Sequence, residues 1–126
     1  MKLSSLVKLV SGEISASDYS AEIRAELAEH SRGLAVAGGI APVSVTEDLD
    51  ILLDRAALSA LCRLFATGQL TAQEFAYTAD VLQLADRVVF SGQDIADDLG
   101  ECTDPEMNGQ LTVARALEIA GSGAAA

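Results

Sequence analysis

Apolar residues recur every three to four positions along most of the chain, which is the spacing of one face of an α-helix. Two segments show this most clearly: residues 16–30, with Tyr19, Ile23 and Leu27 on one face, and residues 46–66, with a wide stripe of leucine and alanine. Regular alternation of apolar and polar residues, which is typical of half-buried strands, is missing. The pattern therefore predicts an all-α fold in which sheet is at most marginal.

Five to six helices are expected to form one small bundle. Their predicted ranges are about 3–10, 16–30, 46–66, 72–89, 93–99 and 112–120, with a further turn beginning at Asp104. Thr46 is expected to cap the third helix, with Glu47 in its first turn. Glycine-rich residues 32–44 predict a long connection or a short extended segment. We therefore expect a single helical domain at residues 1–120 and a flexible tail at residues 121–126.

One phrase occurs three times in the chain: SGEISASD at residues 11–18, TGQLTAQE at 67–74 and GQLT at 109–112. In each copy a glycine that can adopt positive φ would end one helix, and Ser15, Thr71 or Thr112 would cap the next. Glu74 follows Thr71 by three positions, which is the pattern of a capping box. The phrase is either the ordinary joint of a helical hairpin or the trace of an internal duplication.

Composition adds a strong charge bias to this picture. The 126-residue chain has eight basic residues against nineteen acidic ones, a formal net charge of −11, and aromatic residues make up only 4% of it. Scarce aromatics predict a core of leucine, valine, isoleucine and alanine. The charge argues against binding nucleic acid, which requires clustered lysine and arginine, and against an anionic membrane surface. A basic protein is the complementary partner, although acidity also serves solubility alone.

Cysteine and histidine offer no pattern of a metal or catalytic site. Cys62 and Cys102 form no CxxC pair, and His30 is expected to cap the end of its helix rather than act as a base. No cofactor is expected, because the glycines at 33–39 lack a P-loop or dinucleotide motif. The N-terminus is too short and polar for a signal peptide, and no apolar run approaches the roughly 20 residues of a membrane span. These features predict a cytoplasmic protein with reduced thiols.

Acidic residues at helical spacing are the clearest candidate for a functional feature. The three predicted acidic stripes are Asp94, Asp97, Asp98 and Glu101; Glu47, Asp50 and Asp54; and Glu22, Glu26 and Glu29. Like charges at this spacing cost an isolated helix about 0.2–0.5 kcal/mol per pair, and few basic residues are available to offset them. The stripes are therefore candidate partner-binding residues, together with Tyr77, which is predicted to lie exposed opposite the apolar face of its helix. The alternative is a solvated acidic face.

The N-terminal region resembles a known family. The run LVKLVSGEISASDYSAEIRAEL at residues 6–27 is similar to the opening of colicin D-type immunity proteins, small helical bacterial proteins that bind and block a nuclease toxin. The matching residues are Lys8, Leu9, Ile14, Ser15, Ala16, Tyr19, Ser20 and Ile23, with Asp18 where the family usually carries Glu. LTAQEF at residues 70–75 resembles the same pattern. Most matching positions serve capping and packing, so the resemblance implies a toxin partner but assigns no functional residue.

Three functions remain open from the sequence. The first is a non-enzymatic acidic protein that binds a basic partner, such as an immunity protein that occupies the substrate groove of a nuclease toxin domain. The second is a helical scaffold or homo-oligomer with no substrate. The third is a metal-dependent enzyme that uses the cluster from Asp94 to Asp98, whose spacing resembles that of aspartate-rich metal helices. The first accounts for the charge, the lack of catalytic groups and the resemblance together.

Overall fold

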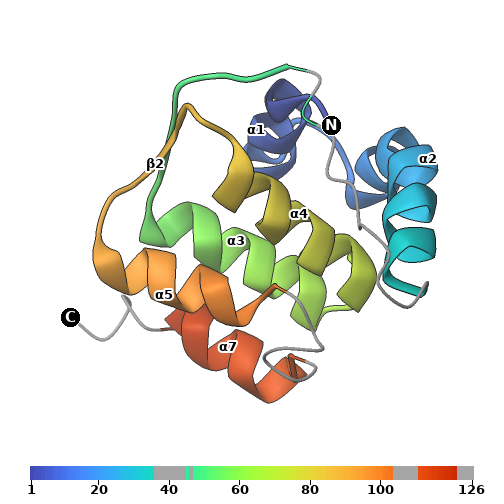
Figure 1. Ribbon diagram of the computed structural model, residues 1–126. Coiled ribbons are helices and arrows are strands. Elements are labelled where there is room, and N and C mark those ends of the chain that lie inside the picture. The colour runs from blue at the N-terminus through green and yellow to red at the C-terminus, as the bar shows by residue number, and fades with distance from the viewer. Residues whose placement is uncertain (36–44, 46, 104–110, 122–126) are drawn as a thin grey trace.

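The computed structural model describes residues 1–35, 45, 47–103 and 111–121. In this part of the chain the helices are α1 (Leu3–Ser11), α2 (Ala16–Ala35), α3 (Arg55–Ala66), α4 (Ala72–Leu84), α5 (Gln93–Glu101) and α7 (Val113–Gly121), and the strands are β1 (Ile51–Leu53) and β2 (Val88–Phe90) (Figure 1). The prediction of a small all-α bundle is confirmed. The predicted start of the tail, residue 121, is one residue too early, because Gly121 is the last residue of α7. Residues 122–126 of the predicted tail lie outside the described residues.

The repeated phrase forms helix-to-helix joints, as predicted. Gly12 and Gly68 adopt φ angles of 82° and 80°, so both lie in the left-handed region that glycine tolerates best. The capping box is complete, since Thr71 Oγ1 accepts the Glu74 amide at 3.1 Å and the Glu74 carboxylate accepts the Thr71 amide at 2.8 Å. Single caps begin α2, from Ser15 to the Asp18 amide, and α7, from Thr112 to the Arg115 amide. Gly109 of the third copy lies outside the described residues.

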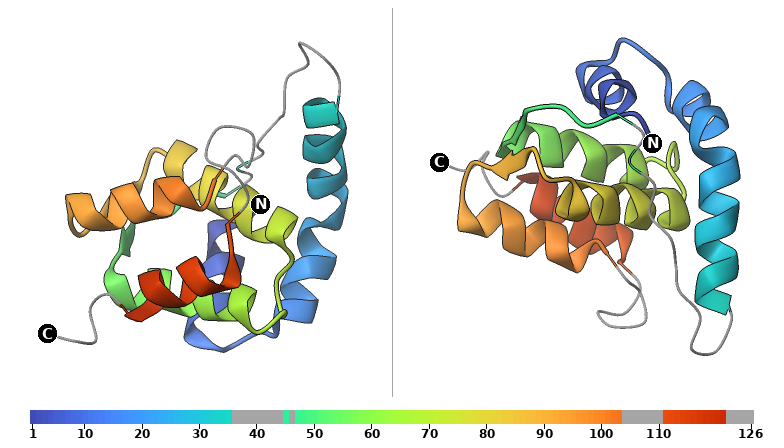
Figure 2. Two further views of the ribbon diagram at one scale, coloured as in Figure 1. Left: turned by 90° about the horizontal axis from the view of Figure 1, so that it is seen from below. Right: turned by 45° about the horizontal axis from the view of Figure 1, so that its top comes forward.

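Helix α3 lies in the middle of the bundle and contacts α1, α4, α5 and α7. Figure 2 shows α5 and α7 on one side of it and α1 on the opposite side. Helix α2 stands along the edge of the bundle, where it packs on α4 and α1. As a result α4 is covered by α3 and α5 on one side and by α2 on another, and this burial decides the environment of several candidate residues.

The core is aliphatic, as the composition predicts. Its largest fully buried side chains are Tyr19, Tyr77, Leu3, Ile23, Leu58, Leu61, Leu70, Leu82, Leu99, Ile119, Val81 and Thr78. The Tyr19 hydroxyl shares a hydrogen bond with Thr78 Oγ1 at 2.7 Å, and burial raises the pKa of Tyr19 well above its ordinary value. Phe65 and Phe75 add one edge-to-face pair with ring centroids 5.5 Å apart. The hydroxyls of Tyr19 and Thr78 are therefore paired inside the core.

The predicted helix at residues 46–66 is wrong in its first half. Helix α3 begins only at Arg55, because the Asp54 side chain accepts the Ala57 amide at 2.9 Å and caps it there. Residues 51–53 form β1 instead, and Leu53 of that strand is buried in the core. A short apolar run such as ILL fits a strand as well as a helix, and only its neighbours in space decide between them.

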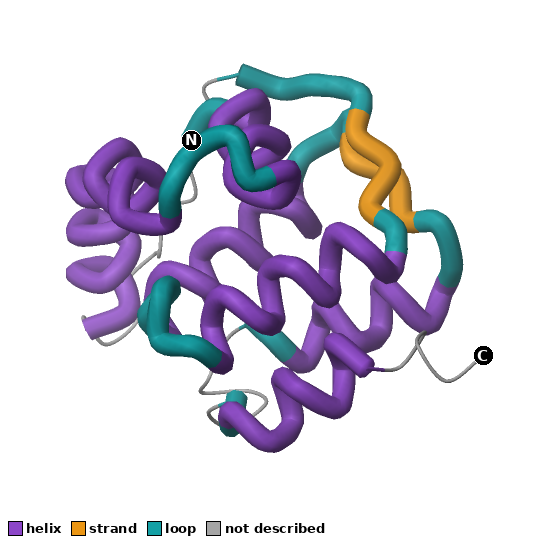
Figure 3. The backbone as a smooth tube through the Cα atoms, turned by 180° about the vertical axis from the view of Figure 1, so that it is seen from behind, coloured by secondary structure: helices purple, strands orange, loops and turns teal. Residues whose placement is uncertain are grey.

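The predicted helix at residues 72–89 also ends early, because α4 stops at Leu84. Ala85 is extended, with φ −70° and ψ 128°, and the chain continues into β2. Strands β1 and β2 are parallel and pair Ile51 with Val88, Leu52 with Val89 and Leu53 with Phe90 (Figure 3). Helices α3 and α4 together form the crossover between the strands, so the marginal sheet expected from the sequence takes the form of one short parallel pair.

Candidate partner-binding surfaces

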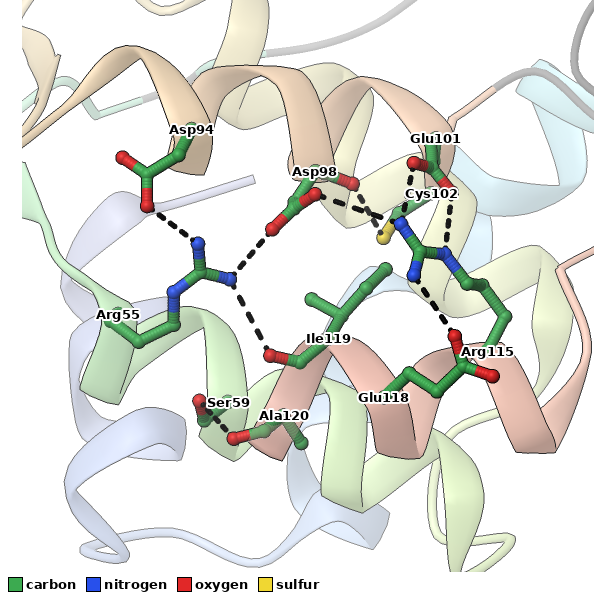
Figure 4. A network of polar contacts seen from close by, with 10 residues as sticks. All are labelled: Arg55, Ser59, Asp94, Asp98, Glu101, Cys102, Arg115, Glu118, Ile119 and Ala120. Atoms are coloured by element: carbon green, nitrogen blue, oxygen red, sulfur yellow. Dashed lines mark hydrogen bonds and ion pairs between the residues drawn. The ribbon is translucent and has the colours of Figure 1, made fainter. Parts of the chain in front are cut away.

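The first predicted acidic stripe lies on α5 and faces arginines of the neighbouring helices. Arg55, the first residue of α3, donates to Asp94 at 2.8 Å and to Asp98 at 2.7 Å (Figure 4). It also donates to the carbonyl oxygen of Ile119 in α7 at 3.4 Å. A cation in the first turn of a helix is opposed by the helix dipole, so Arg55 depends on these acidic partners. One guanidinium thus links α3, α5 and α7.

A second arginine occupies the other end of the same stripe. Arg115 of α7 forms a two-pronged contact with Glu101, at 2.8 and 2.9 Å, and an ion pair with Glu118 at 3.1 Å. Its guanidinium also lies 3.8 Å from Asp98. Planar contacts of this kind are the strongest form of arginine–carboxylate bond. Basic residues are few in this chain, but two of them, Arg55 and Arg115, bind three acids of the stripe and offset part of their mutual repulsion.

Asp97 is the member of this stripe that points away from the arginines. It is exposed, and it accepts a hydrogen bond from the Gln93 amide at 2.9 Å. Glu101 is the last residue of α5, so the stripe is helical along its whole length. Because Arg55 and Arg115 bind the other three acids, the stripe as a whole stabilises the packing of the helices, and Asp97 is the member of the stripe that neither arginine binds.

The predicted stripe of Glu22, Glu26 and Glu29 lies on α2 and lines an open groove of about 640 Å³. Its walls include Glu22, Glu26 and Glu29 together with the N-terminal residues Met1 and Lys2. Glu22 accepts a hydrogen bond from the Ser5 hydroxyl at 2.6 Å, and Glu26 forms an ion pair with the N-terminal ammonium group of Met1. The structure thus gathers these three acids on one face, as predicted, but two of them attach α2 to the N-terminal segment.

Tyr77 is not exposed, and the prediction of an exposed anchor is wrong. Its side chain is fully buried, and its hydroxyl donates to Glu26 at 3.1 Å. Its ring meets His30 edge to face, with centroids 5.0 Å apart. His30 is likewise buried inside α2, which continues to Ala35, so it does not cap a helix end. It lies 3.6 Å from Asp80 of α4. Both aromatic rings hold α2 against α4.

The predicted stripe of Glu47, Asp50 and Asp54 is not helical. Glu47 accepts the Ser4 amide at 3.3 Å through its side chain and the Leu3 amide at 3.0 Å through its carbonyl oxygen, so it attaches the N-terminus to the segment before β1. Asp50 forms an ion pair with Arg87 at 2.9 Å, and Asp54 caps α3. The three carboxylates therefore serve three separate local contacts and do not form the helical stripe that the sequence predicts.

The outer face of the two-stranded sheet is a surface that the sequence did not reveal. Leu52 and Val89 lie opposite each other in the register, and they are 62% and 60% exposed. Side chains alternate along a strand, so Asp50 and Arg87, two positions earlier, belong to the same face. Asp54 and Asp86 are exposed at the two ends of this region. We call Asp50, Leu52, Asp54, Arg87 and Val89 the outer sheet face. Recognising residues 87–90 as a strand would have predicted this surface from the sequence.

No metal centre appears among residues 1–35, 47–103 and 111–121, where histidine, cysteine and carboxylate side chains form no group of three or more suited to holding an ion. Asp94 and Asp98, the candidate metal ligands, have oxygens bonded to the Arg55 guanidinium, which stands where a cation would be held. The geometry of this cluster is that of an ion-pair network.

The arginine contacts make stability depend on pH in a defined direction. Arg115 holds the pKa of Glu101 below its ordinary value, and Arg55 does the same for Asp94. A carboxylate whose folded pKa is depressed contributes stability above its unfolded pKa, about 4, and loses it as the pH falls through the folded pKa. We therefore expect Glu101→Gln to be less stable than the wild type at pH 7, and the difference to disappear near pH 3, in urea unfolding curves.

Glu13→Gln is the matched control for this experiment. Glu13 is exposed in the turn after α1, and no ion pair with another described residue involves it. Comparison with this variant removes the general effect of titrating an acidic protein. A stability difference for Glu101→Gln that is the same at pH 7 and pH 3 would contradict the assigned ion pair.

Comparison of the chain with protein-family models, with curated proteins and with solved structures gave no significant match. Among the helices of the described segments, none has the length and apolar character needed to cross a membrane.

Proposed function

We propose that this protein is a non-enzymatic, acidic protein of the cytoplasm that binds a basic protein partner, and that the partner is a nuclease toxin domain. A net charge of −11 supports a cationic partner. The resemblance of residues 6–27 to colicin D-type immunity proteins supplies the specific choice of a toxin. In this proposal the protein occupies the substrate groove of the toxin, where its carboxylates take the place of nucleic-acid phosphates.

The observation that carries the proposal is the outer sheet face. Both faces of a parallel sheet are normally buried, yet here Leu52 and Val89 remain exposed side by side. Beside this apolar pair lie the Asp54 carboxylate and the ion pair of Asp50 with Arg87, and Asp86 is exposed just before β2. An apolar centre with a charged rim is typical of protein–protein interfaces.

The exposed charged and apolar residues would have different roles in the complex. The exposed carboxylates of Asp54 and Asp86 would steer a basic partner and raise its association rate, which can reach about 10⁸–10⁹ M⁻¹s⁻¹ at low salt. Leu52 and Val89 would be desolvated in the complex and would supply the anchoring contact. Asp94, Asp98 and Glu101 would take little part, because their oxygens are held by Arg55 and Arg115.

A binding experiment tests this proposal. The double variant Leu52→Thr with Val89→Thr places β-branched threonine, which favours strands, at both positions while removing the apolar contact. Immobilised wild type should retain one basic protein from a lysate of the source cells and release it at high salt. With that partner purified, the double variant should bind at least tenfold more weakly, which corresponds to about 1.4 kcal/mol, and should inhibit its nuclease activity less.

Leu117→Gln is the matched control, since Leu117 is 52% exposed but lies on α7, away from the sheet. Its affinity for the partner should equal that of the wild type. An unchanged affinity in the Leu52 and Val89 double variant would remove the outer sheet face from the interface. A purified partner without nuclease activity would contradict the toxin proposal while leaving the binding surface in place.

A second candidate function, a homo-oligomeric scaffold, is favoured by a different surface. Val113 and Leu117 lie one turn apart on α7 and are 48% and 52% exposed. If copies of the chain associate through this face, light scattering should show an oligomer that Leu117→Gln dissociates. A wild-type monomer at high concentration would argue against this candidate.

A further inference from the structure

The two-stranded sheet leaves one edge of β2 without a neighbouring strand. In Figure 1 β2 runs along the rim of the molecule, and β1 lies on its inner side. Within the described part of the chain, β1 is the only strand that pairs with β2. The opposite edge of β2 is therefore open to a third strand.

The hydrogen bonds to β1 show which backbone groups lie on the free edge. The Arg87 carbonyl accepts an amide of β1 at 3.2 Å, and the Ser91 amide donates to the Leu53 carbonyl of β1 at 3.0 Å. Successive residues of a strand direct their amides and carbonyls to opposite sides, and residues two apart face the same neighbour. The backbone groups of Val88 and Phe90 therefore point away from β1.

These outward groups are available for hydrogen bonding, with one exception. The Val88 amide donates to the Ala85 carbonyl at 3.5 Å, in the turn before the strand. No hydrogen bond between described residues engages the Val88 carbonyl or either backbone group of Phe90. The sequence VVF at 88–90 also carries no lysine or proline, the residues that often protect an edge strand from pairing. The edge is thus a template for an added strand.

The charges beside this edge favour a basic segment over a second copy of the chain. Asp86 is exposed just before β2, and Asp94 lies in the first turn of α5 just after it, with a side chain that is 71% exposed. The neighbouring cation, Arg87, is engaged by Asp50. A second copy would bring the same acids and a net charge of −11 against the edge. A segment with lysine or arginine would instead place its cations beside acids.

We infer that the basic partner adds an extended segment to the free edge of β2, as the third strand of the sheet. The backbone of this segment bonds to the Val88 carbonyl and to the Phe90 amide. Its cations lie beside Asp86 and Asp94, and its outward side chains extend the apolar contact of the outer sheet face. The inference rests on the proposed function, because it describes how the partner occupies that face.

A synthetic peptide serves as the probe in an NMR titration of the folded chain. It has blocked ends, alternates lysine with valine and is about six residues long, the usual length of a strand. The peptide should shift the amide signals of residues 86–91 in a saturable way. At a peptide concentration that occupies most of the protein, hydrogen exchange of the Phe90 amide should slow by about tenfold, because a protected amide exchanges only from the free state.

Two matched peptides separate strand addition from simple attraction of charge. The fully N-methylated peptide keeps the side chains and the positive charge but has no amide donors, so it should leave Phe90 exchange unchanged. The peptide with glutamate in place of lysine should not bind. Equal binding of the N-methylated peptide, signal shifts that avoid residues 86–91, or no binding at all would overturn the inference. A dimer of the free protein with Phe90 already protected would overturn it in favour of a second copy.

Failure of the inference can be told apart from failure of the proposed function. If the purified nuclease partner bound the wild type and not the Leu52 and Val89 double variant, yet left Phe90 exchange unchanged, strand addition would be wrong and the function would stand. If the lysine–valine peptide protected Phe90 while the purified partner had no nuclease activity, the edge would be confirmed as a strand-binding site and the toxin proposal would be wrong.

Discussion

Tyr77→Ala is expected to lower the free energy of unfolding by about 3–5 kcal/mol, the usual cost of deleting a large buried aromatic side chain. The Tyr77 ring is fully buried between α4 and α2, where it contacts His30 edge to face, and its hydroxyl donates to Glu26. Removing it leaves a cavity and deletes one hydrogen bond to the Glu26 carboxylate, which keeps its ion pair with the N-terminal ammonium group. Urea unfolding followed by circular dichroism measures the loss.

Tyr77→Phe separates the ring from the hydroxyl. It keeps the packing and loses only the hydrogen bond to Glu26, so a smaller cost of about 1–2 kcal/mol is expected. If Tyr77→Ala instead unfolded at the same urea concentration as the wild type, the side chain would be an exposed one. The interpretation of Tyr77 as a surface anchor would then be restored.

Arg55→Met is expected to cost about 2–3 kcal/mol, since hydrogen bonds to charged groups contribute about 1.5–3 kcal/mol each and their loss is only partly offset. The Arg55 side chain is 20% exposed and that of Asp98 is 19% exposed. Hydration of the remaining Asp98 charge therefore compensates little for the loss of the ion pair. Methionine keeps the aliphatic stem of the side chain and removes only the charge. The loss should appear in thermal and urea unfolding of the purified chain.

Arg63→Met is the matched control, because Arg63 is exposed on the same helix and no ion pair with another described residue involves it. A change within about 0.5 kcal/mol is expected there. Equal losses in the two variants would show that the contacts of Arg55 contribute nothing specific to stability.

The same contacts matter for binding experiments. Replacing Asp94 and Asp98 removes the partners of Arg55, so a lower affinity of such variants would reflect a loss of stability as well as any loss of contact with a partner.

The features that could be predicted from the sequence are the local ones. One short segment contains a glycine with positive φ, a capping hydroxyl and a carboxylate three positions later. The joint between α3 and α4 can therefore be predicted directly from Gly68, Thr71 and Glu74. The all-α class follows in the same way from helical spacing. Helical spacing alone assigns residues 51–53 to a helix, because the strand that they form is defined by pairing with residues 88–90, which are remote in sequence.

The candidate site was harder to predict, because exposure is a property of the whole fold. Helical spacing placed Tyr77 opposite the apolar face of α4, which is the exposed side of a helix packed on one neighbour. Here α2 covers that side, and α4 buries residues all round its axis. Likewise, no local pattern shows that Arg55 and Arg115 reach the acids of α5, since three separate helices supply the network.

The parallel pairing of β1 with β2 also has a consequence for the order of folding. All of α3 and α4 lies between the two strands in the sequence. Pairing the strands therefore closes a long loop but forms only a three-residue pair of strands. Loop-closure entropy makes such a contact costly until the intervening helices have folded back on each other. The helical hairpin of α3 and α4, joined at Gly68, is therefore expected to form before the sheet, and we expect the surface that carries Leu52 and Val89 to be completed late in folding.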